Sequence, residues 1–145
     1  RISRTPGRTR LINVFLAGPD RWIVDLPGYG YAAGPRAESD AWQAMIEGYL
    51  LGRPTLRMVY VLVDAEVGPT ALDRQMLAWL HHVSLPHRIV ATKADQVKPG
   101  RQVARRREGS AALRLAPDTI AWASSKKGKG LTELRYELAA LLELS

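Results

Sequence analysis

Three short, strongly apolar segments alternate along this chain with longer segments whose apolar residues recur at helical spacing. The apolar runs lie at 56–64, 88–92 and 119–123, and their length and near-continuous apolar character are typical of buried strands. Helical periodicity follows each run, over 70–83, 99–115 and 131–142. Because parallel strands need a long crossover connection, this alternation predicts a parallel sheet with helices on both faces.

The first third of the chain predicts a different local arrangement. Two apolar segments, 11–15 and 22–25, flank a turn that contains glycine and proline, and they predict an antiparallel hairpin. A helix is expected to begin at Ser39 or Asp40 and to end before Gly52. The elements together predict one α/β domain, a three-layer sandwich whose mostly parallel sheet carries one antiparallel hairpin strand.

Composition excludes several classes of function. The chain has 145 residues, enough for one domain, and 46% of them are hydrophobic. It contains no cysteine, which excludes disulfides, zinc–thiolate sites and a cysteine nucleophile. Its apolar runs are too short to span a bilayer, so we expect a cytoplasmic protein without a membrane partner. The net charge of +7 favours phosphate-rich partners, although a simply solvated basic surface fits equally well.

Ligands of parallel α/β sheets bind beyond the carboxyl ends of the strands, so candidate site residues are expected directly after each strand. The first such segment is Asp25-Leu26-Pro27-Gly28. An aspartate at a strand end can hold Mg²⁺ through a water molecule, and a glycine lets its N–H approach a terminal phosphate. Taken alone, however, Asp-x-x-Gly is also a common turn.

The second segment is Thr92-Lys93-Ala94-Asp95. The Asp95 carboxylate could accept both N–H groups on the guanine edge as a bidentate pair, whereas adenine presents no such donor pair. The stem of Lys93 can lie along the purine face. A surface turn that opens a helix is the alternative interpretation of these four residues.

The third segment is Ser124-Ser125-Lys126, which follows Ala123 at the end of the last predicted strand. Its backbone N–H groups could meet the guanine carbonyl oxygen. Each segment is weak evidence by itself, but three of them, each after a predicted strand and in the order and approximate spacing of a GTPase domain, predict a site for GTP and GDP. An ATPase is the weaker hypothesis, because Asp95 would have no partner on adenine.

Further segments of the sequence indicate one particular family of GTP-binding proteins. They are Thr5-Pro6-Gly7-Arg8-Thr9, Leu11-Ile12-Asn13 and Asp25-Leu26-Pro27-Gly28-Tyr29-Gly30-Tyr31-Ala32. With these segments, essentially the whole chain resembles the EngB (YihA/YsxC) family of translation-factor-related GTP-binding proteins. The resemblance implies a P-loop GTPase-type fold.

The resemblance also implies roles for individual residues. Thr9 would be the switch-one threonine whose hydroxyl binds Mg²⁺, and Gly7, Arg8, Arg10 and Leu11 would line the same loop. Asp25 and Gly28 would belong to switch two.

In the cell, the resemblance implies a role in assembly of the large ribosomal subunit, with a ribosomal precursor and rRNA as partners and no DNA. Defects would disturb cell division and septation. Arg105-Arg106-Arg107 is a candidate contact to rRNA, although we favour a solvated helix face as the interpretation of this cluster.

Two departures from the family pattern stand out. The phosphate-gripping Gly-x-x-x-x-Gly-Lys-Ser loop is absent from the sequence, and Asp64-Ala65-Glu66-Val67 carries an acid where the family often has arginine. We favour an N-terminally incomplete GTP-binding domain over a degenerate one, because the guanine-reading and magnesium-facing segments are intact. The chain by itself is then expected to bind GTP poorly and to be inactive.

Hydrolysis is therefore expected only of the longer protein, and no catalytic residue is assigned. Many GTPases carry a glutamine directly after the switch-two glycine to orient the attacking water, but this chain has Tyr29 there. We expect slow intrinsic turnover, accelerated by a partner or by a monovalent cation such as K⁺. The alternative function is a non-catalytic RNA- or ribosome-binding module with a decayed nucleotide site.

Overall fold

The computed structural model describes residues 11–28 and 36–143. The chain divides into two compact units, Arg1–Leu56 and Arg57–Ser145, and each is described by itself. Among the described residues, no helix combines the length and the apolar character needed to cross a bilayer.

The first unit contains the predicted hairpin. Strands β1 (Asn13–Gly18) and β2 (Arg21–Asp25) pair antiparallel, with Asn13 opposite Asp25. The turn between them bends through Asp20, whose φ of 54° lies in the left-handed region that aspartate tolerates better than most residues. The predicted hairpin is confirmed.

The helix of this unit, α1, extends over Arg36–Leu51 and so begins earlier than predicted. Ser39 and Asp40, the predicted start, lie inside the helix. The apolar stripe of a helix defines its buried face, but backbone hydrogen bonds can extend it past polar residues that also suit a cap. Ile46 and Leu50, four residues apart and therefore on one face of the helix, are buried.

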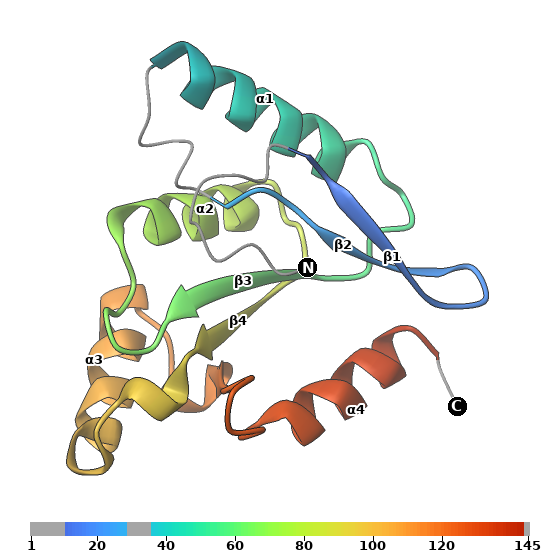
Figure 1. Cartoon of the computed structure of the whole chain (residues 1–145). Helices are drawn as coiled ribbons and strands as arrows, with labels where there is room; N and C mark the ends of the chain where they lie inside the picture. Colours follow the sequence, from blue (N-terminus) through green and yellow to red (C-terminus); the bar gives the residue numbers. More distant parts are fainter. Residues whose placement is uncertain (1–10, 29–35, 144–145) are drawn as a thin grey trace. The chain divides into compact units, whose positions relative to one another are not determined.

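The second unit is built on a three-stranded parallel sheet in the order β3-β4-β5. Figure 1 labels β3 and β4 of this sheet. Its strands are β3 (Val59–Asp64), β4 (His87–Thr92) and β5 (Ile120–Trp122). The strand β3 begins three residues later than predicted, because Leu56 donates a backbone hydrogen bond to Arg53 in a preceding turn. The parallel sheet itself is confirmed.

Three helices follow the three strands, as the periodicity predicted. They are α2 (Ala71–His82), α3 (Gln102–Leu113) and α4 (Leu131–Leu141). A capping box begins α2: the Asp73 N–H donates to Thr70 Oγ1 over 3.2 Å, and the Thr70 N–H donates to Asp73 Oδ2 over 2.7 Å. The predicted helical segment at 99 opens instead as a short 3₁₀ turn, Pro99–Arg101, before α3 begins.

Helices lie on both sides of this sheet. The Tyr60 hydroxyl on β3 donates a hydrogen bond to Glu137 Oε1 on α4 over 2.8 Å, and Arg88 on β4 approaches the same oxygen at 3.4 Å. Burial and the Glu137 hydrogen bond raise the pKa of Tyr60, so it remains a neutral donor. Helix α2 lies on the other side of β3 (Figure 1). Its Leu80 is completely buried.

The connection between β5 and α4 depends on a close approach of two backbone segments. Gly130 has a φ of +70°, and a Cβ atom at this position would overlap the carbonyl oxygen of Trp122. Only glycine satisfies both conditions without a shift of the backbone. This contact fixes the loop over 124–129 against the end of β5.

We expect Gly130→Ala to lower the free energy of unfolding by about 3 kcal/mol, from the left-handed backbone and the clash together. Gly128→Ala is the matched control, because Gly128 has the same φ of +70° but no atom within 4 Å of the position that a Cβ would take. It should cost about 1 kcal/mol. Urea unfolding of the two variants tests this, and equal losses would show that the close approach is unimportant.

Candidate nucleotide-binding site

The strands β3, β4 and β5 run parallel, so their carboxyl ends share one edge of the sheet. The second and the third predicted segments meet at this edge. The Ala94 N–H donates to the Ala123 carbonyl over 3.0 Å, and the Ala123 N–H donates to the Ala91 carbonyl over 2.9 Å. The Thr92–Asp95 segment and the Ala123–Ser125 segment are therefore neighbours, although they lie far apart in the sequence.

Asp95 is held by a side chain from the third predicted segment, which begins at Ser124. The Ser124 hydroxyl, whose residue is only 1% exposed, donates to Asp95 Oδ1 over 2.5 Å and accepts the Lys127 N–H at 3.1 Å. The Ser124 hydrogen bond keeps the pKa of Asp95 below its ordinary value, helped by the nearby charges of Lys126 and Lys127. A carboxylate has about four acceptor positions, so this one keeps capacity for a ligand's paired N–H donors.

The backbone donors of the third segment, Ser124-Ser125-Lys126, differ in part from the prediction. The Ser124 N–H is already used, because it donates to the Lys129 carbonyl over 2.9 Å. The N–H groups of Ser125 and Lys126 have no acceptor among the residues that the structure describes. The site thus offers a charged acceptor on Asp95 and two backbone donors nearby.

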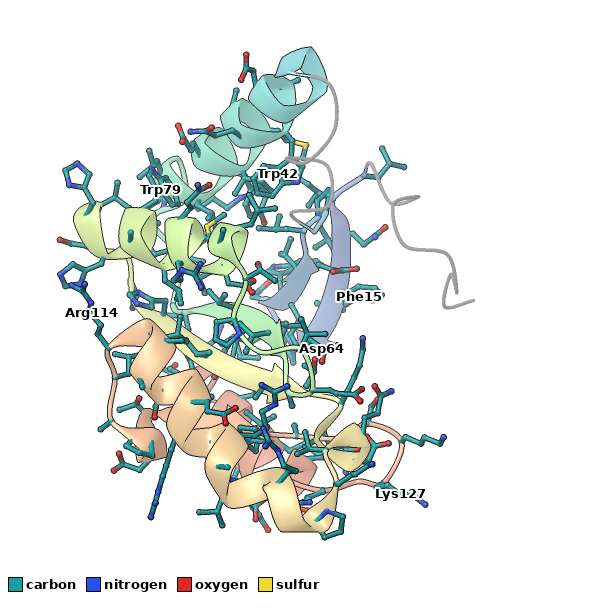
Figure 2. All side chains as sticks on the ribbon, turned by 90° about the vertical axis from the view of Figure 1, so that its left-hand side faces the viewer. Phe15, Trp42, Asp64, Trp79, Arg114 and Lys127 are labelled. Carbon is teal, nitrogen blue, oxygen red and sulfur yellow. The ribbon has the colours of Figure 1, made fainter. Side chains whose placement is uncertain are left out.

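Lys93 adopts a left-handed backbone, with φ of 56° and ψ of 34°, and its Nζ contacts Asp64 Oδ2 at 2.7 Å. The hydrogen bond to Asp64 raises the pKa of Lys93. Burial opposes ionisation of Asp64, but hydrogen bonds from Lys93 and from the Val67 and Glu66 N–H groups outweigh it and lower the pKa of Asp64. Figure 2 shows Asp64 and Lys127 toward the same edge of this unit.

Asp64 is part of the site, but we did not predict it from the sequence. In its segment we considered only that an acid, Glu66, stands where the family often has arginine. An aspartate at a strand end followed by a turn was the available signal, since such side chains commonly accept N–H groups from the next residues. Asp64 does so, and accepts the Glu66 N–H at 2.8 Å and the Val67 N–H at 3.0 Å.

The predicted switch-two segment, Asp25-Leu26-Pro27-Gly28, lies in the other unit, so its approach to the guanine segments stays a prediction. Within that unit, Trp42 Nε1 donates to the carbonyl of the buried Pro27 over 3.1 Å. A tryptophan on the buried face of a helix needs an acceptor for its N–H, a requirement that could have pointed to this contact. Leu11 is described and is 73% exposed, whereas Gly7, Arg8, Thr9, Arg10 and Tyr29 lie outside the described residues.

Of the two predicted magnesium ligands, Thr9 and Asp25, only Asp25 lies within the described residues. Its carboxylate is exposed at the end of β2, and an oxygen ligand there suits a hard cation through a water molecule. No group of three or more His, Asp or Glu side chains that could hold a metal ion gathers in the described part of the chain. Asp25 fits one position of a magnesium site and does not build that site by itself.

The consecutive arginines at 105–107 are mostly engaged within the protein. Arg105 Nη1 contacts Glu108 Oε2 at 3.1 Å, and the Arg106 guanidinium lies 5.1 Å from the centre of the Trp122 ring. Their contribution to packing explains at least part of this cluster without any partner. Its role as an rRNA contact stays a prediction.

Comparison with known proteins places the chain in a family. No protein-family model matches it. It is 42% identical over 149 residues to a probable GTP-binding protein EngB of Bradyrhizobium diazoefficiens, with 99% of this chain and 68% of the relative aligned. The EngB relative of Thermotoga petrophila is 37% identical over 143 residues, covering 98% of this chain and 73% of that protein. The chain belongs to the EngB family.

A relative from Cereibacter sphaeroides is also a probable GTP-binding protein EngB. It is 41% identical to this chain over 144 residues, and the alignment covers 97% of this chain. This chain spans 66% of that relative's length, and likewise 66% of the Ruegeria pomeroyi EngB protein. The resemblance inferred from the sequence is therefore confirmed.

Solved structures confirm the fold. A crystal structure of a probable GTP-binding protein EngB superposes with a TM-score of 0.75 at 16% identity, covering 92% of this chain and 84% of that one. Era from Aquifex aeolicus, crystallised with GDP and aluminium fluoride, gives a TM-score of 0.65 at 20% identity, covering 90% of this chain and 44% of Era. The predicted P-loop GTPase-type α/β fold is correct.

The Ser124–Asp95 hydrogen bond yields a titration test. We expect Ser124→Ala to raise the pKa of Asp95, because the variant loses the donor that favours the charged carboxylate. A group whose pKa is lowered on folding stabilises the fold above its unfolded pKa and loses this contribution as the pH falls through its folded pKa. The variant should therefore lose less stability than the wild type on acidification.

Carboxyl ¹³C NMR titration of Asp95 measures the change directly. Ser125→Ala is the control, because this neighbouring side chain is exposed and makes no hydrogen bond to a described residue. An Asp95 titration that is the same in Ser124→Ala and in the wild type would contradict the assigned role of the hydroxyl.

Proposed function

We propose that this chain supplies the guanine-recognition part of a GTP- and GDP-binding switch. The observation that carries the proposal is the Asp95 carboxylate fixed by buried Ser124, next to the backbone donors of Ser125 and Lys126. Guanine presents two adjacent N–H donors and a carbonyl acceptor on one edge, which match this acceptor and these donors. Adenine would leave the carboxylate without a donor pair.

Magnesium is the proposed cofactor of the complete protein. Asp25 would hold it through water and Thr9 through its hydroxyl, and the ion would neutralise the charge of the phosphates. Hydrolysis of GTP to GDP is proposed for the complete protein, with slow intrinsic turnover, since Tyr29 offers no amide to orient the attacking water. A partner or a monovalent cation such as K⁺ would accelerate it.

A cytoplasmic ribosomal precursor is the proposed partner, with a role in large-subunit assembly and through it in division and septation. The charge of +7 supports a phosphate-rich partner, and Lys126 and Lys127 make no ion pair with a described residue. The same basic surface is the observation that favours the alternative, a non-catalytic RNA-binding module. Binding of a fluorescent GDP analogue to the full gene product separates the two.

A substitution of Asp95 that changes the preferred base from guanine to xanthine tests the proposal most directly. In the full gene product, Asp95→Asn should weaken GDP binding by at least about tenfold, because a charge-assisted pair is lost. The same variant should gain affinity for xanthosine diphosphate, whose ring offers one donor and one carbonyl where guanine offers two donors. An asparagine amide complements that pair with its oxygen and its NH₂ group.

Asp118→Asn is the matched control, because Asp118 is an exposed carboxylate just before β5, at the opposite end of that strand. Competition of both diphosphates against fluorescent GDP gives the preferences. If Asp95→Asn kept the wild-type preference for GDP over xanthosine diphosphate, Asp95 would not be the residue that reads the base.

A further inference from the structure

The contact between Asp64 and Lys93 joins the end of β3 to the turn that carries Asp95. The two side chains come from positions 29 residues apart, and their charged atoms lie 2.7 Å from each other. Building on the proposed function, we infer that Asp64 is a positioning residue for nucleotide recognition. It holds Lys93 so that the methylene stem of the lysine lies along the face of a bound guanine base.

The two oxygens of Asp64 have separate roles. Oδ1 accepts the N–H groups of Glu66 and Val67, which fixes the turn after β3, while Oδ2 accepts the Lys93 ammonium. The Asp64 side chain is 25% exposed and the Lys93 side chain 56% exposed. The carboxylate is thus the more firmly enclosed partner, and the lysine is the one whose surface remains open to a ligand.

The turn that carries Asp64 is itself anchored from three directions. The Gly68 N–H returns to the Asp64 carbonyl at 2.8 Å, and the Ala65 N–H donates to the Thr92 carbonyl on β4 at 2.9 Å. The Arg105 guanidinium on α3 donates to the Glu66 carbonyl. These contacts tie the turn to the sheet and to a helix, so Asp64 is a fixed point against which Lys93 is held.

The backbone of Lys93 explains why such an anchor is useful. Its left-handed conformation, with φ of 56°, sets the direction in which the side chain leaves the turn two residues before Asp95. A free lysine side chain has large rotational freedom, which a ligand that packs against it must restrict. The ion pair restricts that freedom before the ligand arrives, which is pre-organisation of the binding site.

A double-mutant cycle on the full gene product tests this role. Asp64→Asn keeps an oxygen for the two N–H groups and removes the charge that holds the lysine, while Lys93→Met keeps an apolar stem without the ammonium. We expect each single variant to weaken GDP binding about threefold, within the range that exposed ion pairs support. The double variant should be no weaker than either single one.

Two further readouts separate positioning from folding. The difference between wild type and Asp64→Asn should shrink in 1 M salt, where charges are screened over about 3 Å. The thermal midpoint of Asp64→Asn should stay near that of the wild type, whereas Asp64→Ala, which leaves the Glu66 and Val67 N–H groups without their acceptor, should be less stable. A binding loss that persists unchanged in high salt would overturn the inference.

The outcomes also distinguish this inference from the proposed function. If the wild type prefers GDP to ADP but both single variants bind GDP as tightly as the wild type, only the positioning role fails. The same holds if the two losses multiply in the double variant, which would mean that the residues act independently. If the wild type binds no guanine nucleotide, the proposed function fails and this inference fails with it.

Discussion

The hydrogen bond from Ser124 to Asp95 is the interaction on which the candidate site depends. It joins two loops that follow different strands, and its donor is almost completely buried, so the carboxylate has a fixed position. The same hydroxyl accepts the Lys127 N–H and thereby shapes the loop that presents the donors of Ser125 and Lys126. One buried hydroxyl therefore sets the relative position of an acceptor and of the donors that complement guanine.

The backbone around this hydrogen bond is held in uncommon conformations. Lys93 is left-handed, and Gly130 combines a positive φ with a close approach to the Trp122 carbonyl. Such conformations persist only where the surrounding contacts enforce them, and they often occur at binding sites. Here the parallel strands β4 and β5 provide the rigid support, because both loops begin where these strands end.

The fold was predictable because its signals are local. The Thr70–Asp73 capping box, the hairpin and the alternation of strands and helices all depend on residues that are close in sequence, and the structure contains each of them. The start of α1 was misplaced because Ser39 and Asp40 are residue types that favour a cap, whereas the helix begins at Arg36 and includes them.

The side-chain arrangement of the site was less predictable. Asp64 and Lys93 meet only because β3 and β4 pair in parallel with Asp64 opposite Thr92, a register that the sequence does not reveal. For the same reason the buried hydroxyl of Ser124 was not recognised as the partner of Asp95. The arginines at 105–107 were a candidate contact to RNA, but the contacts of Arg105 with Glu108 and of Arg106 with Trp122 are visible only in the structure.

The central claim is that Asp95 reads the two N–H donors of guanine together, and calorimetric titration of the full gene product with GDP and inosine diphosphate tests it most directly. Inosine diphosphate differs from GDP in the base only by lacking the 2-amino group, so it can offer Asp95 one donor instead of two. We predict that it binds at least about tenfold more weakly than GDP, the loss expected for one hydrogen bond to a charged acceptor. Equal affinities for the two nucleotides would contradict the account.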